Sequence, residues 1–379
     1  MSIINYPLSL PFPNIFYNMS RQSIFLNIKI IDLSTVLAGP SVGSFFAELG
    51  AEVIKIEHPE HPDVTRLWKM PNEDKDSSVS AYFSSINYKK VYRQLNLRME
   101  NHREQLFEEL KSADIILMNF KLGDQEKLQI TDEKLHEINP QIIIGKINGF
   151  GAKSDRVAYD LILQAETGIM SMNGTPKSGP VKMPIAFIDV LAAHHLKEGL
   201  LIELFAKKGN EHYQGKSLSV SLYDAAVSSL VNQASNYLMN NHVPQRIGSL
   251  HPNIAPYGEL FETTDHKTIT FAIGSNRHFK QLCSFLDIEN LAKDERFKNV
   301  QQRVKNRTLL FELLNEKIKQ FSADEILTYM HQNFVPCGEV KDLEAVFETK
   351  AAKDLVRTEV IDGKETKRVS GIAFQIKDL

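Results

Sequence analysis

Cysteine and tryptophan are scarce in this chain. Its 379 residues include two cysteines, Cys283 and Cys337, and one tryptophan. Two cysteines so far apart in sequence exclude a disulfide framework, and neither belongs to the Cys/His spacing of a zinc site. We therefore expect a reducing compartment, with the cytoplasm as the default location, and no bound metal.

Long apolar runs and a large net charge are also lacking. No stretch approaches the roughly 20 apolar residues of a membrane-spanning helix. The formal net charge is −3, and the basic residues are spread out, so the sequence predicts neither a nucleic acid nor a membrane partner. Residues 1–27 contain an apolar stretch that prolines interrupt, with no basic start, which predicts a peripheral extension instead of a signal peptide.

What the chain does contain is a regular alternation of strand and helix patterns. A strand at 29–33, a helix at 44–49 and a strand at 52–57 predict a right-handed βαβ unit. Further buried-type strands are expected at 93–97, 114–118, 142–147 and 217–221. This order predicts an α/β fold with a Rossmann-like parallel sheet. The glycine spacing after the first strand matches neither the dinucleotide-binding fingerprint nor a phosphate-binding P-loop.

The length of the chain predicts two or three domains. A segment rich in Asn, His, Pro and Gly near 225–260 marks the best boundary, because the pattern beyond it changes to one strand followed by several helices. We assign residues 28–224, completed by 350–379, to a large domain. Residues 225–349 form a smaller α+β domain with its linkers.

The apolar run at 184–188 ends at Asp189, directly before a helical pattern that continues to about Lys207. A strand that ends in a carboxylate presents it at the carboxyl edge of a sheet, where open α/β folds bind ligands. Aspartate is also a preferred helix N-cap residue. From local sequence alone, capping is the simpler interpretation of Asp189.

Short motifs along residues 28–345 change that interpretation. They read D-L-S-T-V-L-A-G-P at 32–40, L-G-A-E-V-I-K-I-E at 49–57, D-V-T-R at 63–66, A-D at 113–114, N-F at 119–120, G-F-G at 149–151, A-Y-D at 158–160, H-P at 251–252, P-Y-G at 256–258, N-R at 306–307 and V-P-C-G at 335–338. In this order they resemble the class III CoA-transferases, which include formyl-CoA transferase and the carnitine CoA-transferases. The same fold family contains α-methylacyl-CoA racemase.

The resemblance implies an interlocked homodimer that acts on an acyl-CoA and a free carboxylic acid, with no permanently bound cofactor. It makes Asp189 the nucleophile and Asp160 an accessory acid, with Tyr159 and Gln164 as further active-site residues. The positions that the resemblance assigns to coenzyme A are Val36, Leu37, Ala38, His58, Lys90, Asn119, Phe120 and Lys127. His58 and Lys127 stand where the family commonly has arginine.

The implied reaction passes through a mixed anhydride and an aspartyl-CoA thioester on Asp189. A carboxylate that is ionised at pH 7 attacks a thioester without a general base. An acyl-CoA racemase is the nearest alternative, but racemases carry histidine where this chain has Tyr159. A CoA-binding protein without turnover, with Asp189 only as a cap, is the other alternative. The glycine-rich loop of formyl-CoA transferase is absent, so that particular activity is not expected.

Overall fold

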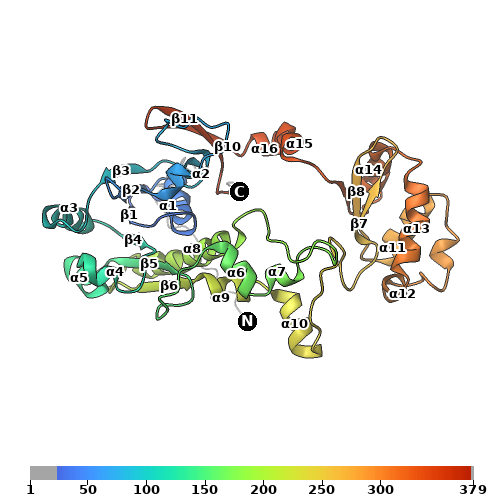
Figure 1. The fold of residues 1–379 in the computed structure, drawn as a ribbon, viewed down its shortest axis with the longest axis horizontal. Coiled ribbons are helices and arrows are strands. Elements are labelled where there is room, and N and C mark those ends of the chain that lie inside the picture. The colour runs from blue at the N-terminus through green and yellow to red at the C-terminus, as the bar shows by residue number, and fades with distance from the viewer. Residues whose placement is uncertain (1–23, 377–379) are drawn as a thin grey trace, which may run out of the picture. The chain divides into compact units, whose positions relative to one another are not determined.

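The computed structural model describes residues 24–376. The predicted N-terminal extension, residues 1–27, lies outside this range except for its last four residues. The chain forms two compact units (Figure 1). The first contains the described residues up to Asp160 together with Phe187–Ser229 and the chain from Leu355 onward, and the second contains Leu161–Ala186 and Leu230–Asp354.

The first unit is built on a six-stranded parallel sheet with the order β3-β2-β1-β4-β5-β6. Its strands are β1 (Lys29–Asp32), β2 (Glu52–Glu57), β3 (Val91–Gln94), β4 (Ile115–Met118), β5 (Ile143–Asn148) and β6 (Ser217–Ser221). The predicted α/β fold with a parallel sheet is confirmed. The direction of strand succession reverses between β1 and β4, and such a switch point leaves a crevice at the carboxyl ends of the strands.

Helices cover both faces of this sheet. Ile31, Ile54, Ile116 and Ile144 form one buried cluster with residues of α3 (Glu100–Leu110) and α5 (Asp132–Ile138). Neighbouring strand residues point to the opposite face. There, a Cβ added at Gly145 would contact Leu196 and Leu200 of α8 (Phe187–Lys207). Helix α8 also packs on α1 (Ala38–Glu48), so α1 and α8 form the second layer.

Helix α1 begins earlier than its sequence pattern predicts, at Ala38 instead of Ser44. The small residues after β1 lie inside the helix and allow it to pack closely. A Cβ at Gly39 would lie 2.3 Å from the Cβ atom of Ser34, and one at Gly43 would lie 3.0 Å from a carboxylate oxygen of Asp32. These glycines therefore serve the contact between helix and strand.

The predicted strand at 184–188 is wrong, because helix α8 already begins at Phe187 and places Asp189 in its first turn. Strand β6 pairs with β5 and is the last strand on its side of the sheet. The backbone of residues 184–188 therefore pairs with no strand of the sheet. The remaining short helices of this unit are η2 (Val64–Leu67), α2 (Ala81–Ser85), α4 (Asp124–Leu128) and α9 (Leu222–Ser228).

The C-terminal segment returns to the first unit as the hairpin β10 (Val356–Ile361) and β11 (Lys364–Val369). Buried Glu48, the last residue of α1, holds its base. One carboxylate oxygen of Glu48 accepts a hydrogen bond from Arg357 Nε at 3.2 Å, and the other accepts one from the backbone of Gly371 at 3.1 Å. Asp362 in the hairpin turn pairs with Arg66 at 3.0 Å.

The second unit contains a three-stranded antiparallel sheet and a helical layer around a core of its own. Its elements are α7 (Ile169–Met172), α10 (Val231–Asn240), β7 (Tyr257–Glu262), β8 (Thr268–Ala272), α11 (Asn276–Phe285), η3 (Leu291–Lys293), α12 (Val300–Lys305), α13 (Arg307–Ile318), α14 (Ala323–Gln332), β9 (Cys337–Glu339), α15 (Leu343–Glu348) and α16 (Lys350–Lys353), together with most of α6 (Asp160–Glu166).

Residues 161–186 were predicted to lie in the large domain but group with this second unit. Hydrogen bonds to the 246–248 segment give the reason. The backbone of Gly248 donates to Gly174 at 2.8 Å, and the guanidinium of Arg246 donates to the carbonyl of Ser171 at 3.0 Å. Such long-range pairing leaves no local pattern in the sequence.

Candidate active site

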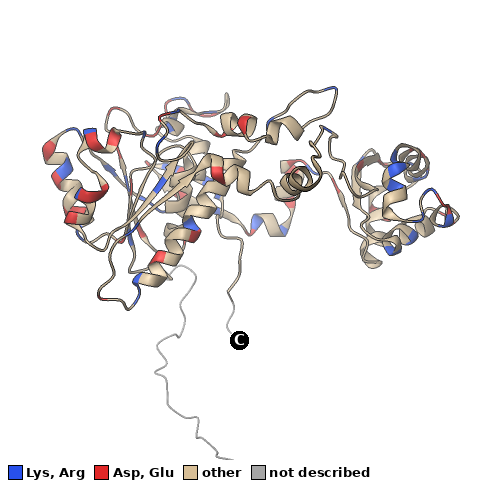
Figure 2. Cartoon of the chain, turned by 90° about the horizontal axis from the view of Figure 1, so that it is seen from below, with Lys and Arg blue, Asp and Glu red and all other residues tan. Residues whose placement is uncertain are grey.

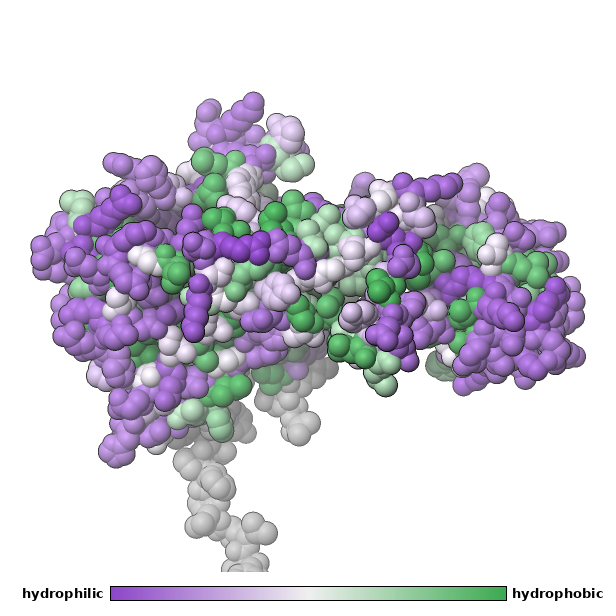
Figure 3. Space-filling view, turned by 60° about the horizontal axis from the view of Figure 1, so that its bottom comes forward, coloured by the Kyte–Doolittle hydropathy of each residue, from purple (hydrophilic) through white to green (hydrophobic). Residues whose placement is uncertain are grey.

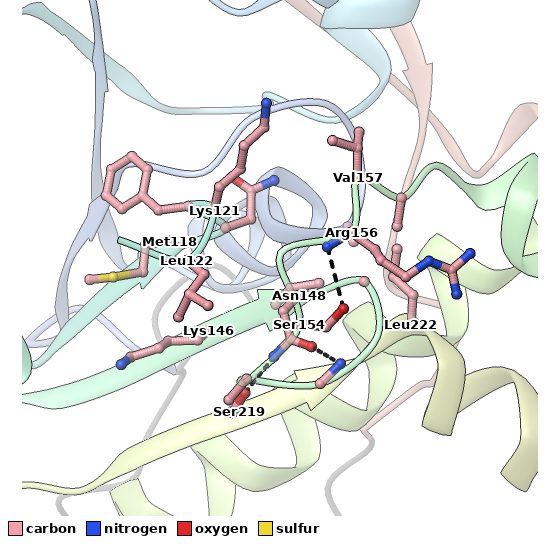
Figure 4. A pocket seen from close by; sticks show the side chains of 18 of the residues that line it. Met118, Lys121, Leu122, Lys146, Asn148, Ser154, Arg156, Val157, Ser219 and Leu222 are labelled. Carbon is pink, nitrogen blue, oxygen red and sulfur yellow. Dashed lines mark hydrogen bonds between the residues drawn. The ribbon is translucent and has the colours of Figure 1, made fainter. Parts of the chain in front are cut away.

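A pocket of about 280 Å³ opens in the first unit at the carboxyl ends of its central strands (Figure 4). Seven of the predicted site residues line it: Val36, Leu37, Ala38, Asn119, Phe120, Tyr159 and Asp189. They come from four separate stretches of the chain. The predicted nucleophile and most of the predicted CoA-binding positions therefore share one cavity.

The turn between β1 and α1 forms one wall of the pocket. Its central residue, Val36, has a backbone φ of 74°. A β-branched side chain disfavours this left-handed conformation, which costs roughly 1–3 kcal/mol and persists only where surrounding contacts offset that cost. On one side, the side-chain amide of Asn119 accepts from the backbone N–H of Thr35 at 3.0 Å and donates to the carbonyl of Thr35 at 2.8 Å. Asn119 therefore fixes this wall from the adjacent strand.

Asp189 lies in the first turn of α8, and a second carboxylate completes that turn. Oδ2 of Asp160 accepts a hydrogen bond from the backbone N–H of Ile188 at 2.7 Å. Asp160 thus does for α8 what an N-cap side chain does for other helices, although it comes from the start of α6. The capping role that local sequence suggested for Asp189 belongs to Asp160.

The surroundings of Asp189 favour its protonated form. Burial, followed by repulsion from the Asp160 carboxylate, raises the pKa of Asp189 to about 7. A helix N-terminus acts in the opposite direction, but here burial and the neighbouring charge dominate. A perturbed carboxyl in a pocket is a typical sign of a functional site. Asp189 therefore differs from an ordinary aspartate, whose pKa of about 4 leaves it ionised at pH 7.

Tyr82 of α2 is a neighbour of both carboxylates that the sequence did not reveal. Burial, then the charges of Asp189, Asp160 and Asp63, raise the pKa of Tyr82 to about 12. Its ring packs edge-on against Trp68, with ring centroids 5.1 Å apart. Tyr82 therefore remains a neutral hydroxyl near Asp189. No local motif marks it, because α2 follows an irregular segment.

Three further cations line the pocket and were not predicted: Lys121, Lys146 and Arg156. In Figure 4, Lys121 and Lys146 lie at one end of the pocket and Arg156 at the other. Lys146 pairs with Asp132 at 2.6 Å, and the guanidinium of Arg156 stacks 3.8 Å from the ring centre of Phe150. Lys121 directly follows the N-F motif, and this position in the sequence could have indicated that it lies near the pocket.

Lys90, a predicted CoA ligand, is buried beneath the pocket wall. Its Nζ donates to Asp32 and to the carbonyl of Pro40 at 2.8 Å each, and to Asn87 at 2.9 Å. These three acceptors use all three donors of an ammonium group. The arrangement argues against a phosphate contact and gives Lys90 a structural role, because its side chain is fully enclosed.

Burial alone would raise the pKa of Asp32, but Lys90, Lys55 and hydrogen bonds outweigh it, so the pKa of Asp32 lies below its usual value. Burial lowers the pKa of Lys90 to about 8, and the Asp32 carboxylate limits this fall. The pair is thus charged at neutral pH in spite of its burial.

His58, Lys127 and Gln164 are not among the residues that line the pocket. Nδ1 of His58 accepts the backbone N–H groups of Glu60 and His61 at 3.1 and 3.2 Å, which orders a turn after β2. Lys127 is 73% exposed and pairs with Asp124 at 3.0 Å. Gln164 is buried in the second unit, where its Oε1 accepts from the backbone of Met183 at 2.8 Å.

Within residues 24–376, no group of three or more His, Cys, Asp or Glu side chains could hold a metal ion. No helix in that range is long and apolar enough to cross a membrane. Basic and acidic side chains are intermixed over the elements of each unit, as Figure 2 shows.

The chain resembles known proteins over nearly its whole length. Residues 26–378 match the model for CoA-transferase family III. A succinate–glutarate CoA-transferase of Agrobacterium fabrum is 31% identical and covers 86% of this chain and 82% of its own length. An acetyl-CoA:oxalate CoA-transferase of Acetobacter aceti is 31% identical over 84% of this chain and 81% of its own.

Among solved structures, a CaiB/BaiF family protein from Brucella suis is 33% identical and superposes with a TM-score of 0.80, covering 94% of this chain and 93% of its own. The parallel sheet, the pocket at its carboxyl edge and these similarities agree with the family that the sequence motifs indicated. The chain belongs to CoA-transferase family III and is a CoA-transferase.

Proposed function

We propose that this enzyme moves CoA between carboxylic acids through covalent intermediates on Asp189. The observation that carries the proposal is the position of Asp189, in the first turn of α8, lining the pocket and beside the Asp160 carboxylate. A carboxylate of raised pKa is a stronger nucleophile than an ordinary one, because its charge is poorly stabilised in the free enzyme.

In the first half of the reaction, an ionised oxygen of Asp189 forms a bond to the thioester carbonyl carbon. The C–S bond breaks, the CoA thiolate departs, and a mixed anhydride remains. The thiolate then attacks the carbonyl carbon of Asp189, so that the donor acid leaves as a carboxylate and CoA is held as an aspartyl thioester. In the second half, the acceptor carboxylate attacks that thioester, and the same two steps run in reverse.

Asp160 has two roles in this proposal. It accepts the Ile188 N–H and so fixes the first turn of α8, and its charge raises the pKa of Asp189. The neutral hydroxyl of Tyr82 is available as a hydrogen-bond donor near the reacting carboxylate. Both intermediates hydrolyse readily, so the pocket must exclude water while they exist.

We infer that the acids exchanged are short dicarboxylic acids. Relatives named for succinate with glutarate, for oxalate and for mesaconate support this class. A panel of succinate, glutarate, oxalate and mesaconate, with propionate and benzoate as monocarboxylic comparisons, is offered to acetyl-CoA and, except for succinate, to succinyl-CoA, and the new thioester is measured. Turnover confined to monocarboxylic acids would contradict it.

We also infer a homodimer. Apolar side chains of α8 and α10 are exposed: Leu201, Ile202, Phe205, Tyr237, Leu238 and Met239. Phe205 is 82% exposed. Apolar patches also interrupt the polar surface in Figure 3. Several exposed apolar side chains on one helix, as on α8 and separately on α10, commonly mark subunit contacts. Light scattering of the purified chain tests this inference, and a monomer at micromolar concentration would contradict it.

The covalent route is tested by incubating the enzyme with acyl-CoA, trapping with hydroxylamine or borohydride, and mapping the adduct by mass spectrometry. We expect modification at Asp189 and none in Asp189→Asn. An adduct at Asp160 would move the nucleophile to that residue. Exchange of the α-proton with solvent and no adduct would favour a racemase. If the protein binds CoA but shows neither an adduct nor α-proton exchange, it would be a CoA-binding protein without turnover.

A further inference from the structure

The backbone of Val36, in its left-handed conformation, is hydrogen-bonded to a residue from another part of the sheet. The backbone N–H of Val36 donates to Oδ2 of Asp63 at 3.1 Å. Asp63 follows β2, is only 1% exposed, and uses its other oxygen to accept from the backbone and hydroxyl of Thr65 at 3.0 and 2.7 Å. The contacts with Thr65 therefore fix the orientation of the Asp63 carboxylate independently of Val36.

A buried lysine from β2 supports this carboxylate. Nζ of Lys55 lies 3.4 Å from Asp63, and neither side chain has any exposed surface. The same ammonium group donates to the carbonyl of Ser34 at 2.5 Å. Lys55 thus connects Asp63 to the first residues of the turn that contains Val36.

The network continues on the other side of that turn. Both the backbone N–H and the hydroxyl of Ser34 donate to Asp32, at 3.0 and 2.5 Å. Asp32 in turn pairs with Lys90 at 2.8 Å. Two buried lysines and two buried aspartates therefore surround the segment from β1 to the start of α1. An ion pair of this kind adds little to stability compared with apolar packing, but its directional contacts fix one geometry.

The turn that contains Val36 also forms part of the pocket wall. Val36, Leu37 and Ala38 line the pocket that also contains Asp189. Rotation of Val36 out of the left-handed region would redirect the backbone on both sides of it, since φ and ψ set the course of the chain. The pocket wall would then change shape without any change in the side chains that line it.

We propose that Asp63 is a positioning residue for CoA transfer, which acts by holding the backbone of Val36 so that residues 36–38 form the wall facing Asp189. This inference rests on the proposed function of the pocket. It predicts that the effect of losing Asp63 depends on whether residue 36 needs to be held. Glycine adopts a φ near 74° without strain, so Val36→Gly removes that need.

The test is a double-mutant cycle of Asp63→Ala and Val36→Gly, read as the KM for acyl-CoA and as the Kd for free CoA from calorimetry. We expect Asp63→Ala to raise both constants about tenfold in the wild-type background and less than about threefold in the Val36→Gly background. Equal effects in the two backgrounds would overturn the proposal, because they would mean that Asp63 acts independently of Val36.

Glu48→Gln is the matched control. Glu48 is also a buried carboxylate of the first unit, but it holds the C-terminal hairpin and not the pocket wall. We expect Glu48→Gln to lower Tm with KM unchanged. A lowered Tm with unchanged KM in Asp63→Ala as well would reduce Asp63 to a structural role and refute the proposal.

If Asp63→Ala does not fold, Asp63→Asn takes its place in the cycle. The asparagine oxygen can still accept from Val36 while the charge facing Lys55 is lost, so we expect a smaller rise in KM, again reduced by Val36→Gly. Because CoA binding is read separately from turnover, failure of covalent catalysis at Asp189 would leave this coupling measurable. Unchanged CoA affinity in every Asp63 variant would overturn this proposal about Asp63 and leave the proposed function of the pocket untouched.

Discussion

Oδ2 of Asp160 lies 2.7 Å from the backbone nitrogen of Ile188, the residue directly before Asp189. One carboxylate thereby completes the first turn of the helix that carries the other. The same contact brings a negative charge close to Asp189, whose pKa burial and this charge raise to about 7. Helix capping and pKa adjustment are consequently properties of one side chain.

Asp160→Asn separates these two roles. Its amide oxygen can still accept the Ile188 N–H, but the charge that raises the pKa of Asp189 is removed. In the proposed mechanism Asp189 must be ionised to attack, so activity falls as pH drops through its pKa, and a lower pKa keeps the enzyme active at lower pH. We expect the acidic limb of the kcat/KM profile to move to lower pH, as measured with acyl-CoA over pH 5–9.

Asp160→Ala is the companion variant for that measurement. It shifts the acidic limb in the same direction and also leaves the N–H group without its acceptor, so we expect a loss of about 1 kcal/mol in the free energy of unfolding. An acidic limb that stays in place in both variants would contradict the assigned charge effect.

The parallel sheet and most of its strands follow from sequence patterns because the apolar runs of the strands are local. The start of α8 does not. The run 184–188 has the apolar character of a strand, and the group that caps the helix comes from Asp160, more than twenty residues earlier. Local sequence contains no record of such a contact.

The sequence could not distinguish the positions of Lys90 and Lys121 for a similar reason. A lysine that lines a pocket and a lysine buried beneath its wall have the same local sequence pattern, and the contact between Lys90 and Asp32 becomes apparent only in the structure. Asp189 was predicted to be the nucleophile by resemblance to a family, since local sequence alone favoured a cap. Strain at Val36 has no sequence signature either, because valine is an unusual residue for that conformation.

Tyr82 and Asp189 should titrate as coupled groups. The charge of Asp189 contributes to the raised pKa of Tyr82, after burial. We therefore expect Asp189→Asn to lower the pKa of Tyr82 below about 12. Carbon-13 NMR of ζ-labelled tyrosine up to pH 11 measures the ionised fraction, with Tyr82→Phe to assign the signal. Identical titration in wild type and Asp189→Asn would show that the two groups do not interact.

Asp189→Asn should also stabilise the protein in alkaline solution. The folded pKa of Asp189, about 7, lies above the ordinary value of 3.8. Between these values the folded state binds more protons than the unfolded state, so stability falls as pH rises through this window. We expect Asp189→Asn to exceed wild type by roughly 1–3 kcal/mol at pH 8 and to match it near pH 4, after allowance for partial exposure.

Urea unfolding at the two pH values measures this difference. Asp224→Asn is a useful comparison because Asp224 is an exposed aspartate in the first turn of α9. The Asp224→Asn variant loses a favourable interaction with the helix dipole, so we expect it to be less stable than wild type at pH 8. Equal destabilisation by both substitutions at pH 8 would contradict the idea that Asp189 is held in an unfavourable charged state.

We expect Lys90 to have a structural role and Lys121, which lines the pocket, to contact the substrate. Lys90→Met leaves Asp32 buried without its partner, and loss of one member of a buried pair costs about 3–5 kcal/mol. Lys121→Met removes a pocket cation, so we expect a stability within about 0.5 kcal/mol of wild type and a raised KM for acyl-CoA. Thermal unfolding and steady-state kinetics on both variants separate the two roles. A stable Lys90→Met enzyme with a raised KM would support a CoA-binding role for Lys90, because its charge would then stabilise bound CoA and not the buried Asp32.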